Sequence, residues 1–227
     1  MEDSHIELIE PPFDETELQC WTYLDWVNWE TIRDKVLKIL EDYEWLTSRH
    51  GITITSRHLP DLYERIDNEV PEIKDFLRSK GWEDGFADYA VVVIKPYGEF
   101  QKHSDGITKE SGNCRILVPL SGTKGCSTIF WQPDQPARKI IAPSTDGTPM
   151  PFWSYTHANC YEITRFELDK PVLMHIAPCH EVENHTTGMR MNLWISFNSK
   201  VNLLPEIPYT ETPLAKNINI LNNLNEV

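Results

Sequence analysis

Short segments rich in β-branched and aromatic residues dominate the chain after Gly85, and they constrain its fold more than any other feature. These segments are separated by Gly, Pro, Asn and Asp, and they read DYAVVVIKPY, CRILVPLSG, CSTIFWQ, YEITRFELD, PVLMHI and MRMNLWISFN. Runs of strand length that are broken by turn-forming residues are typical of an antiparallel β region. We therefore expect about eight strands in the second half of the chain.

Two segments before these strands show helical patterns. Between Asn28 and Arg49, apolar residues recur close to the period of a helix, and Asn28 is a candidate N-cap. A second helix is predicted over PEIKDFLRSKGW, with Pro71 in its first turn and Gly81 just past its end. Their polar faces are charged and their apolar faces carry no chemical groups, so we expect both helices to pack against the β region.

The length and composition fit a single domain built from three parts. Residues 1–85 should form helical and strand elements that pack on the core, and residues 86–200 should form the β core itself. Residues 132–159 contain five prolines and are predicted to form a long irregular loop, a kind of segment that is usually functional or disordered. Residues 201–227 form a C-terminal tail, either packed as a strap or loose.

The charge of the chain argues against nucleic acid as a partner. Lys and Arg number 21 against 35 Asp and Glu, so the formal net charge is −14, and no basic cluster is available for phosphates. No apolar run is long enough for a membrane span, and the acidic start MEDSHIELIE does not resemble a secretory signal. The five scattered cysteines indicate neither a disulfide framework nor a thiolate zinc site. We expect a soluble, cytoplasmic protein without a membrane partner.

The stretch KHSDG contains a His-x-Asp pair that could bind a metal ion. His103 and Asp105 are two positions apart, so their side chains share one face of an extended segment. A polar loop also produces such pairs by chance, so the pair alone does not define a site. A second histidine and an anion-binding partner are needed.

His180 is a candidate for that second histidine because an arginine follows it ten positions later, in HEVENHTTGMR. Gly188 is placed to turn the chain into the strand that begins near Arg190. His175 and His185 lack such an arginine, but both stay as rival ligands.

The strand that begins at Arg190 has two different faces. One face carries Arg190, Asn192, Trp194 and Ser196, and the other is an apolar core face. A buried arginine needs an anion, which either an internal Asp or Glu or the carboxylate of a ligand supplies.

Together these motifs resemble those of the Fe(II)- and 2-oxoglutarate-dependent dioxygenases, most of all the prolyl-4-hydroxylase-type branch. The similarity runs from about Tyr97 to Phe197 and comprises PYGEFQKHSD, the arginine that opens the next strand, GCSTIF, HEV and GMR. The resemblance implies a mainly β fold with helices (α+β). Its core would be a double-stranded β-helix, or jelly roll, with the N-terminal helices packed on one sheet.

The resemblance also implies roles for individual residues. The catalytic iron ligands would be His103, Asp105 and His180. Arg190 would bind the distal carboxylate of 2-oxoglutarate, and Asn192 and Tyr97 would assist in binding this co-substrate. Two imidazoles and one carboxylate occupy one face of an octahedron, which leaves three positions for the co-substrate and dioxygen.

Four further residues are candidates for substrate contacts: Arg115, Trp131, Trp153 and Tyr155. Arg115 either binds a substrate or caps a strand. The three aromatic residues lie in or beside the Pro-rich segment, and packing is the commoner role for such side chains.

The expected activity is hydroxylation of a C–H bond of a protein side chain, an amino acid or a small molecule, with release of succinate and CO2. An alternative from another class is a non-catalytic cupin-type module that binds a metal or a small acid. Nucleobase oxidation is a weaker alternative because the surface is acidic.

Overall fold

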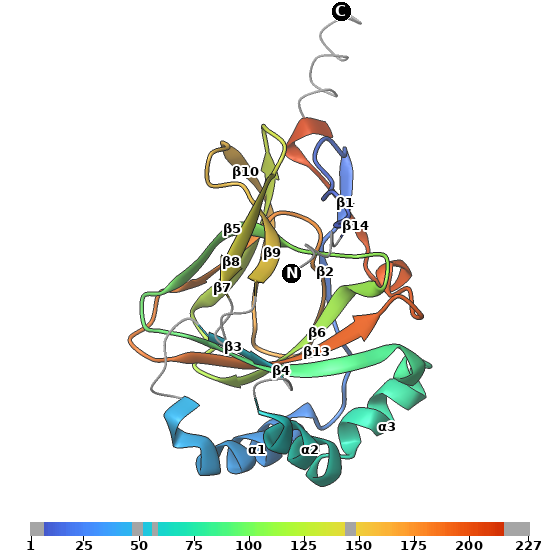
Figure 1. Ribbon diagram of the computed structural model, residues 1–227, viewed down its shortest axis with the longest axis vertical. Coiled ribbons are helices and arrows are strands. Elements are labelled where there is room, and N and C mark those ends of the chain that lie inside the picture. Colours follow the sequence, from blue (N-terminus) through green and yellow to red (C-terminus); the bar gives the residue numbers. More distant parts are fainter. Residues whose placement is uncertain (1–6, 47–51, 56–58, 144–148, 216–227) are drawn as a thin grey trace, which may run out of the picture.

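The computed structural model describes residues 7–46, 52–55, 59–143 and 149–215, and its centre consists of two antiparallel sheets (Figure 1). The helix-side sheet contains, in spatial order, β2 (Trp21–Tyr23), β11 (Val172–His175), β6 (Ser111–Ser121), β13 (Arg190–Asn198), β4 (Phe86–Ile94) and β3 (Ile52–Thr55). The opposite sheet contains, in spatial order, β10 (Cys160–Glu167), β7 (Cys126–Pro133), β12 (His180–Asn184), β5 (Glu99–Asp105), β9 (Pro149–Ser154) and β8 (Arg138–Pro143).

The order of strands is that of a double-stranded β-helix. The chain alternates between the two sheets through β4, β5, β6 and β7, starting in the helix-side sheet, and again through β10, β11, β12 and β13, starting in the opposite sheet. Strands of the first set lie beside strands of the second, as in the orders β4-β13-β6-β11 and β5-β12-β7-β10. This interleaving confirms the predicted fold class, a jelly roll with added helices.

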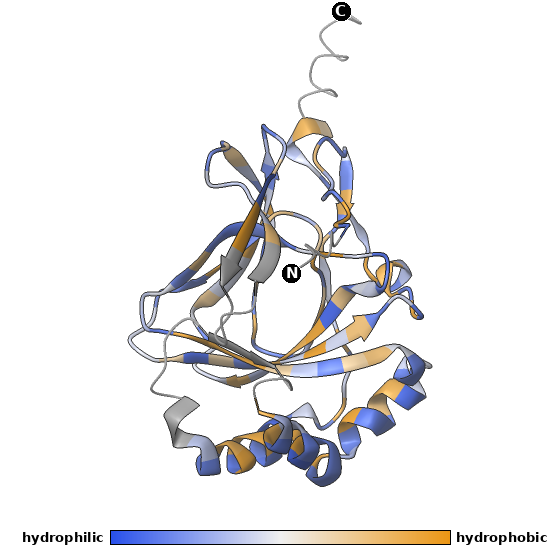
Figure 2. Ribbon diagram, in the orientation of Figure 1, coloured by the Kyte–Doolittle hydropathy of each residue, from blue (hydrophilic) through white to orange (hydrophobic). Residues whose placement is uncertain are grey.

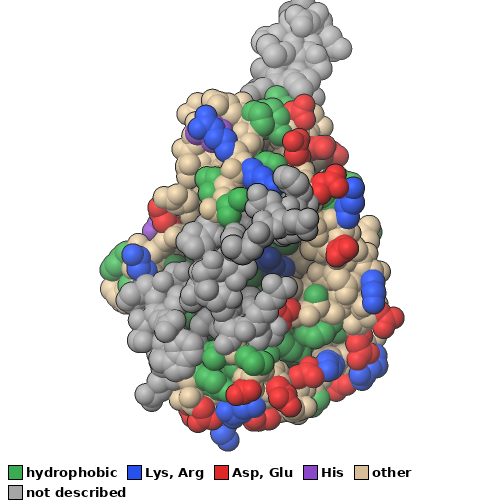
Figure 3. Space-filling model, viewed as in Figure 1, with side chains coloured by type: hydrophobic (Ala, Val, Ile, Leu, Met, Phe, Trp, Pro, Cys, Tyr) green, Lys and Arg blue, Asp and Glu red, His purple; other side chains and the backbone are tan. Residues whose placement is uncertain are grey.

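Three helices pack on the helix-side sheet: α1 (Trp29–Leu40), α2 (Pro60–Glu69) and α3 (Glu72–Ser79). Apolar residues alternate with polar ones along these helices (Figure 2). Their apolar side chains meet the sheet in one core, in which Val36, Leu77 and Leu193 are fully buried. Their outer faces carry both acidic and basic side chains (Figure 3). The helices therefore support the sheet, as predicted, and no described helix is both long and apolar enough to span a membrane.

The helix boundaries differ in part from the prediction. α3 matches the second predicted helix, whereas α2 has no counterpart in the sequence-based interpretation. The first predicted helix ends at Leu40 and continues as the 3-10 helix η1 (Glu41–Leu46), within which Tyr43 has a non-helical backbone. Asn28 does stand at the N-cap, but its side chain makes no capping hydrogen bond and its backbone is left-handed.

The expected irregular loop over residues 132–159 is wrong for most of its described part. Within it, β8 and β9 pair antiparallel and extend the opposite sheet beyond β5, and residues 144–148 lie outside the described residues. Prolines are tolerated here because β8 is an edge strand and because β9 pairs with β5 only from Phe152 to Ser154, beyond its prolines.

The described part of the C-terminal tail packs as a strap. It contains the 3-10 helix η3 (Leu204–Glu206) and β14 (Tyr209–Glu211), which pairs with β1 (Glu17–Gln19). Gln19 donates hydrogen bonds to two backbone carbonyls near η3. The short 3-10 helix η2 (Glu83–Gly85) leads into β4, and residues 216–227 lie outside the described residues.

We predict that Gly122→Ala destabilises the fold far more than Gly81→Ala. Both glycines have positive φ, but a Cβ at Gly122 would lie 1.9 Å from the carbonyl oxygen of Met189, whereas nothing lies within 4 Å at Gly81. The left-handed backbone costs an alanine about 1–2 kcal/mol at either position, and overpacking adds about 1–3 kcal/mol at Gly122. Urea denaturation measures both changes in the free energy of unfolding, and equal values would contradict the prediction.

Candidate functional site

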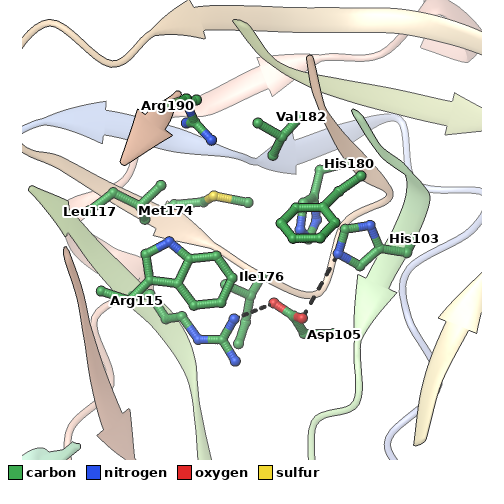
Figure 4. Close-up of a pocket in the computed structure, with 11 residues that line it drawn as sticks. His103, Asp105, Arg115, Leu117, Met174, Ile176, His180, Val182 and Arg190 are labelled. Carbon is green, nitrogen blue, oxygen red and sulfur yellow. Dashed lines mark hydrogen bonds and ion pairs between the residues drawn. The ribbon is translucent and has the colours of Figure 1, made fainter. Parts of the chain in front are cut away.

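The candidate site is a pocket between the two sheets (Figure 4). Both sheets contribute to its walls through β5, β6, β11, β12 and β13. The lining residues are Phe100, His103, Asp105, Arg115, Leu117, Met174, Ile176, His180, Val182, Arg190 and Trp194. The pocket therefore contains the three predicted iron ligands and both predicted arginines.

The pairing of β5 with β12 brings the two histidines together. His180 is the direct antiparallel partner of His103, and their ring centroids are 4.4 Å apart. Asp105, two residues further along β5, points to the same face, with its Oδ1 atom 4.0 Å from His103 Nε2.

Both imidazoles are held in the same tautomer by the backbone. His103 Nδ1 lies 2.6 Å from the carbonyl oxygen of Gln101, and His180 Nδ1 lies 2.9 Å from that of Pro178. Because a carbonyl only accepts hydrogen bonds, each Nδ1 carries a proton, so in the neutral form of each ring Nε2 is the nitrogen with a free lone pair. Such second contacts orient metal-binding histidines in proteins.

The local electrostatics keep the histidine neutral and the carboxylate charged. Burial lowers the pKa of His180 to about 3. Burial opposes ionisation of Asp105, but the charge of Arg115 acts in the opposite direction, and the Asp105 pKa lies below its usual value. Arg115 Nη1 donates to Asp105 Oδ2 at 2.6 Å, and its guanidinium lies 4.5 Å from the centre of the Trp194 ring.

Arg190 has no acidic partner among the described residues, although it is almost fully buried. Its Nη2 atom donates a long hydrogen bond of 3.4 Å to Thr128, and its Nε atom has no partner. Burial lowers its pKa to about 10, which leaves it charged at neutral pH. Two acidic side chains of the opposite sheet pair with other residues, Glu162 with Arg165 and Glu181 with Lys102.

The described residues contain no ready-made cluster of three metal-binding side chains. Adjacent ligands on an octahedral ion lie about 3 Å apart when each bond is about 2.1 Å long. The 4.0 Å gap between His103 and Asp105 must therefore shorten by about 1 Å for both to bind one ion.

Two predicted co-substrate residues have different positions. Asn192 is fully buried and lies between Arg190 and Trp194 along β13. In the orientation in which its amide nitrogen and its amide oxygen are both hydrogen-bonded, the oxygen accepts from Trp194 Nε1 at 2.7 Å. Tyr97 lies in the turn between β4 and β5 and is 70% exposed. The structure therefore brings Asn192 beside the pocket and does not bring Tyr97 to it.

The three aromatic substrate candidates lie outside the pocket lining. Trp153 pairs with Ser104, so it occupies the sheet face opposite to His103 and Asp105, and its Nε1 atom donates to the carbonyl of Ile9. Tyr155 is buried, 3.4 Å from the Ser104 hydroxyl. Trp131 packs under Lys102.

Several pocket residues were missed from the sequence: Phe100, Leu117, Met174, Ile176, Val182 and Trp194. Trp194 could have been found, because it shares the strand face of Arg190. Phe152 is a further neighbour, directly opposite Asp105 in the β5–β9 pairing, with its ring centre 6.3 Å from that of His103. Thr128, from the GCSTIF motif, contacts Arg190.

The rival histidines have other partners. His175 Nδ1 lies 2.8 Å from the carbonyl oxygen of Gln19, and His185 pairs with Glu183 on the surface. Neither lines the pocket.

Comparisons with known proteins were made for sequence and structure. No family model and no curated protein matches the sequence. The structure matches AviO1 from Streptomyces viridochromogenes Tue57, with a TM-score of 0.49, 13% identity and coverage of 81% of this chain and 91% of that one. It also matches a prolyl hydroxylase from Trichoplax adhaerens, solved with a hypoxia inducible factor peptide fragment, with a TM-score of 0.46, 12% identity and coverage of 80% and 84%.

A third match is the viral collagen prolyl hydroxylase of Paramecium Bursaria Chlorella virus-1, solved with 2OG. It has a TM-score of 0.43, 14% identity and coverage of 78% of this chain and 95% of that one. Because these TM-scores are below 0.5, the fold assignment rests on this chain's own strand order.

We predict that acid destabilises the metal-free protein partly through His175. Burial lowers its pKa to about 4, whereas a histidine in the unfolded chain titrates near about 6.5. The unfolded state therefore binds the proton first, and the free energy of unfolding decreases as the pH falls from about 6.5 to about 4. His175→Asn should flatten this decrease in urea denaturation, and the exposed control His185→Asn should not. Identical pH profiles for the two variants would refute this role.

Proposed function

We propose that this protein is an Fe(II)- and 2-oxoglutarate-dependent dioxygenase of the hydroxylase type. The observation that carries the proposal is the buried guanidinium of Arg190, which lacks an acidic partner and shares a pocket with two imidazoles and an ionised carboxylate. A charge buried without a counter-ion is costly, so this position favours a ligand carboxylate. Arginine is suited to hold one by two parallel hydrogen bonds.

The donor set in the pocket fits Fe(II). His103 and His180 offer their Nε2 atoms, and Asp105 offers a carboxylate, which is the set typical of non-haem Fe(II) sites with open positions. Asp105 can bind through Oδ1 while Arg115 continues to hold Oδ2, so one carboxylate oxygen is used. For His103 and Asp105 to bind one ion, the gap between them would have to close by about 1 Å.

With 2-oxoglutarate and dioxygen, a bound Fe(II) would supply the oxidising power to hydroxylate a C–H bond, with release of succinate and CO2. The chain itself binds and orients the reactants. Figure 4 shows Val182 and Met174 toward the space between Arg190 and the imidazoles, with Leu117 beside Met174. These apolar side chains would exclude water and suit the methylene groups of 2-oxoglutarate. Its distal carboxylate would reach Arg190 and Thr128 at the far end of the pocket.

The substrate would enter on the side of Asp105, away from Arg190. Phe100 lines the pocket and Phe152 lies beside Asp105 across the β5–β9 pairing, so both are suited to contact it. The substrate that these two phenylalanines would contact is a protein side chain, an amino acid or a small molecule.

We predict that His103→Ala, Asp105→Ala and His180→Ala each weaken binding of Mn(II), an oxygen-stable stand-in for Fe(II), by at least about 100-fold, because each removes one of three ligands. Isothermal titration calorimetry of chelator-treated protein measures this affinity. His185→Ala is the matched control and should bind like the unchanged protein. Retained affinity in His180→Ala would overturn the ligand assignment.

We predict that Arg190→Met leaves Mn(II) affinity within about twofold but weakens 2-oxoglutarate binding to the Mn(II)-loaded protein by about 10–100-fold, because a charge-assisted pair is lost from a buried site. Arg165→Met, on the surface, is the control. Unchanged 2-oxoglutarate affinity in Arg190→Met would contradict the proposal.

A turnover screen then tests the activity itself. Succinate release with Fe(II) would be measured against peptides, amino acids, small acids and nucleosides, with Asp105→Ala as the inactive control. Metal and 2-oxoglutarate binding without stimulated succinate release by any compound would favour the alternative of a non-catalytic cupin-type binding module.

A further inference from the structure

The pocket face of the helix-side sheet brings two residues of β13 close to the arginine that holds Asp105. Asn192 and Trp194 are two positions apart on β13, so their side chains share one face of the strand. Ser196, the next residue on this face, is the antiparallel partner of Arg115 on β6. Arg115 is therefore a diagonal neighbour of Trp194, a separation that a large aromatic side chain can bridge.

Three contacts join these side chains in a row. In the orientation in which both ends of the Asn192 amide are hydrogen-bonded, its oxygen accepts from Trp194 Nε1 at 2.7 Å and its nitrogen donates to the carbonyl of Val92 at 3.3 Å. The Arg115 guanidinium lies 4.5 Å from the centre of the Trp194 ring. Arg115 Nη1 donates to Asp105 Oδ2 at 2.6 Å, along one of the dashed lines in Figure 4.

The surroundings of Asn192 favour a role that acts through Trp194 and not directly on a ligand. Asn192 is fully buried, and both ends of its amide are used within the protein. It does not line the pocket, whereas Arg190 and Trp194, its neighbours on the same strand face, do. A buried amide that is paired in this way fixes the side chain that it contacts.

The Trp194 ring has a physical reason to matter for the carboxylate. An arginine side chain has many rotamers, and ordering it costs conformational entropy. A flat indole against the planar guanidinium restricts Arg115 before any metal binds. While Arg115 holds Oδ2 of Asp105, the other oxygen, Oδ1, stays available on the side of His103, whose Nε2 atom is 4.0 Å away.

We propose that Asn192 and Trp194 are positioning residues for the metal ligand Asp105. Asn192 orients the indole of Trp194, and the indole holds the guanidinium of Arg115. The guanidinium then presents one carboxylate oxygen to the metal. This inference rests on the proposed function, which makes Asp105 a ligand, and it assigns Asn192 to the metal and not to 2-oxoglutarate.

Hydrogen exchange of indole N–H groups, followed by NMR on the metal-free protein, tests the first contact. The Trp194 signal is identified by its absence in Trp194→Phe. Asn192→Ala should speed its exchange by at least about tenfold, because the acceptor is lost. The Trp21 indole, which donates to Thr164 on another part of the same sheet, is the internal control and should exchange as before. An unchanged rate for Trp194 would overturn the role of Asn192.

Calorimetry with Mn(II) tests the effect on Asp105. Trp194→Leu should weaken Mn(II) binding by about tenfold, because Arg115 loses its support. Trp194→Phe keeps an aromatic face against the guanidinium and should stay within about threefold of the unchanged protein. Trp21→Leu is the control for the loss of an indole from this sheet and should bind normally. Unchanged Mn(II) affinity in Trp194→Leu would overturn the proposal.

A double-mutant cycle separates positioning from a general loss of packing. Once Arg115→Met has removed the contact with Asp105, adding Trp194→Leu should change Mn(II) affinity by no more than about twofold. A further loss of about tenfold would contradict the proposal, because Trp194 would then act without Arg115.

The affinity for 2-oxoglutarate distinguishes the two possible roles of Asn192. At saturating Mn(II), Asn192→Ala should bind 2-oxoglutarate within about twofold of the unchanged protein, in contrast to the loss expected for Arg190→Met. A loss of 2-oxoglutarate affinity that exceeds the loss of Mn(II) affinity would overturn the assignment of Asn192.

Failure of the proposed function would look different from failure of this inference. If the unchanged protein bound no Mn(II), the proposed function would fail. If His180→Ala lost Mn(II) binding and Trp194→Leu kept it, only the positioning role would fail.

Discussion

The antiparallel pairing of β5 with β12 is the interaction on which the candidate site depends. It sets His180 directly opposite His103, and it can form only when the double-stranded β-helix brings two distant segments of the chain together. A slip of one residue would turn His180 to the outer face of the sheet. The helices packed on the other sheet contribute to this register indirectly, because they bury its outer face and so stabilise the closed fold.

Charge is balanced unequally along the pocket. At one end, Asp105 and Arg115 compensate each other, and burial keeps His180 neutral. At the other end, Arg190 has only a hydroxyl partner in the described protein. A pocket with one compensated end and one uncompensated cation, joined by apolar walls, favours an elongated ligand that places a carboxylate on Arg190. This asymmetry, more than any single residue, separates the pocket from an ordinary core.

The sequence predicted those features that depend on alternation within one strand, and it failed where pairing between strands decides. The shared faces of His103 with Asp105 and of Arg190 with Trp194 follow from the period of a strand, and the structure has both. Register is invisible in one sequence, so Trp153 was a candidate for substrate contact, whereas the pairing sets Trp153 opposite Ser104 and Phe152 opposite Asp105. The hairpin of β8 and β9 was missed because its prolines argue against strands unless the edge position is known.

The same alternation gives the opposite sheet two chemistries on its two faces. His180 points into the pocket, whereas Cys179 and Glu181 point to the outer face, and Lys102 stands in the same relation to His103. A substitution of Cys179 or Glu181 therefore alters a residue directly next to His180, a candidate metal ligand, without placing a new side chain in the pocket. His180 is sensitive to such a change, because its tautomer depends on a hydrogen bond to Pro178, the residue before Cys179.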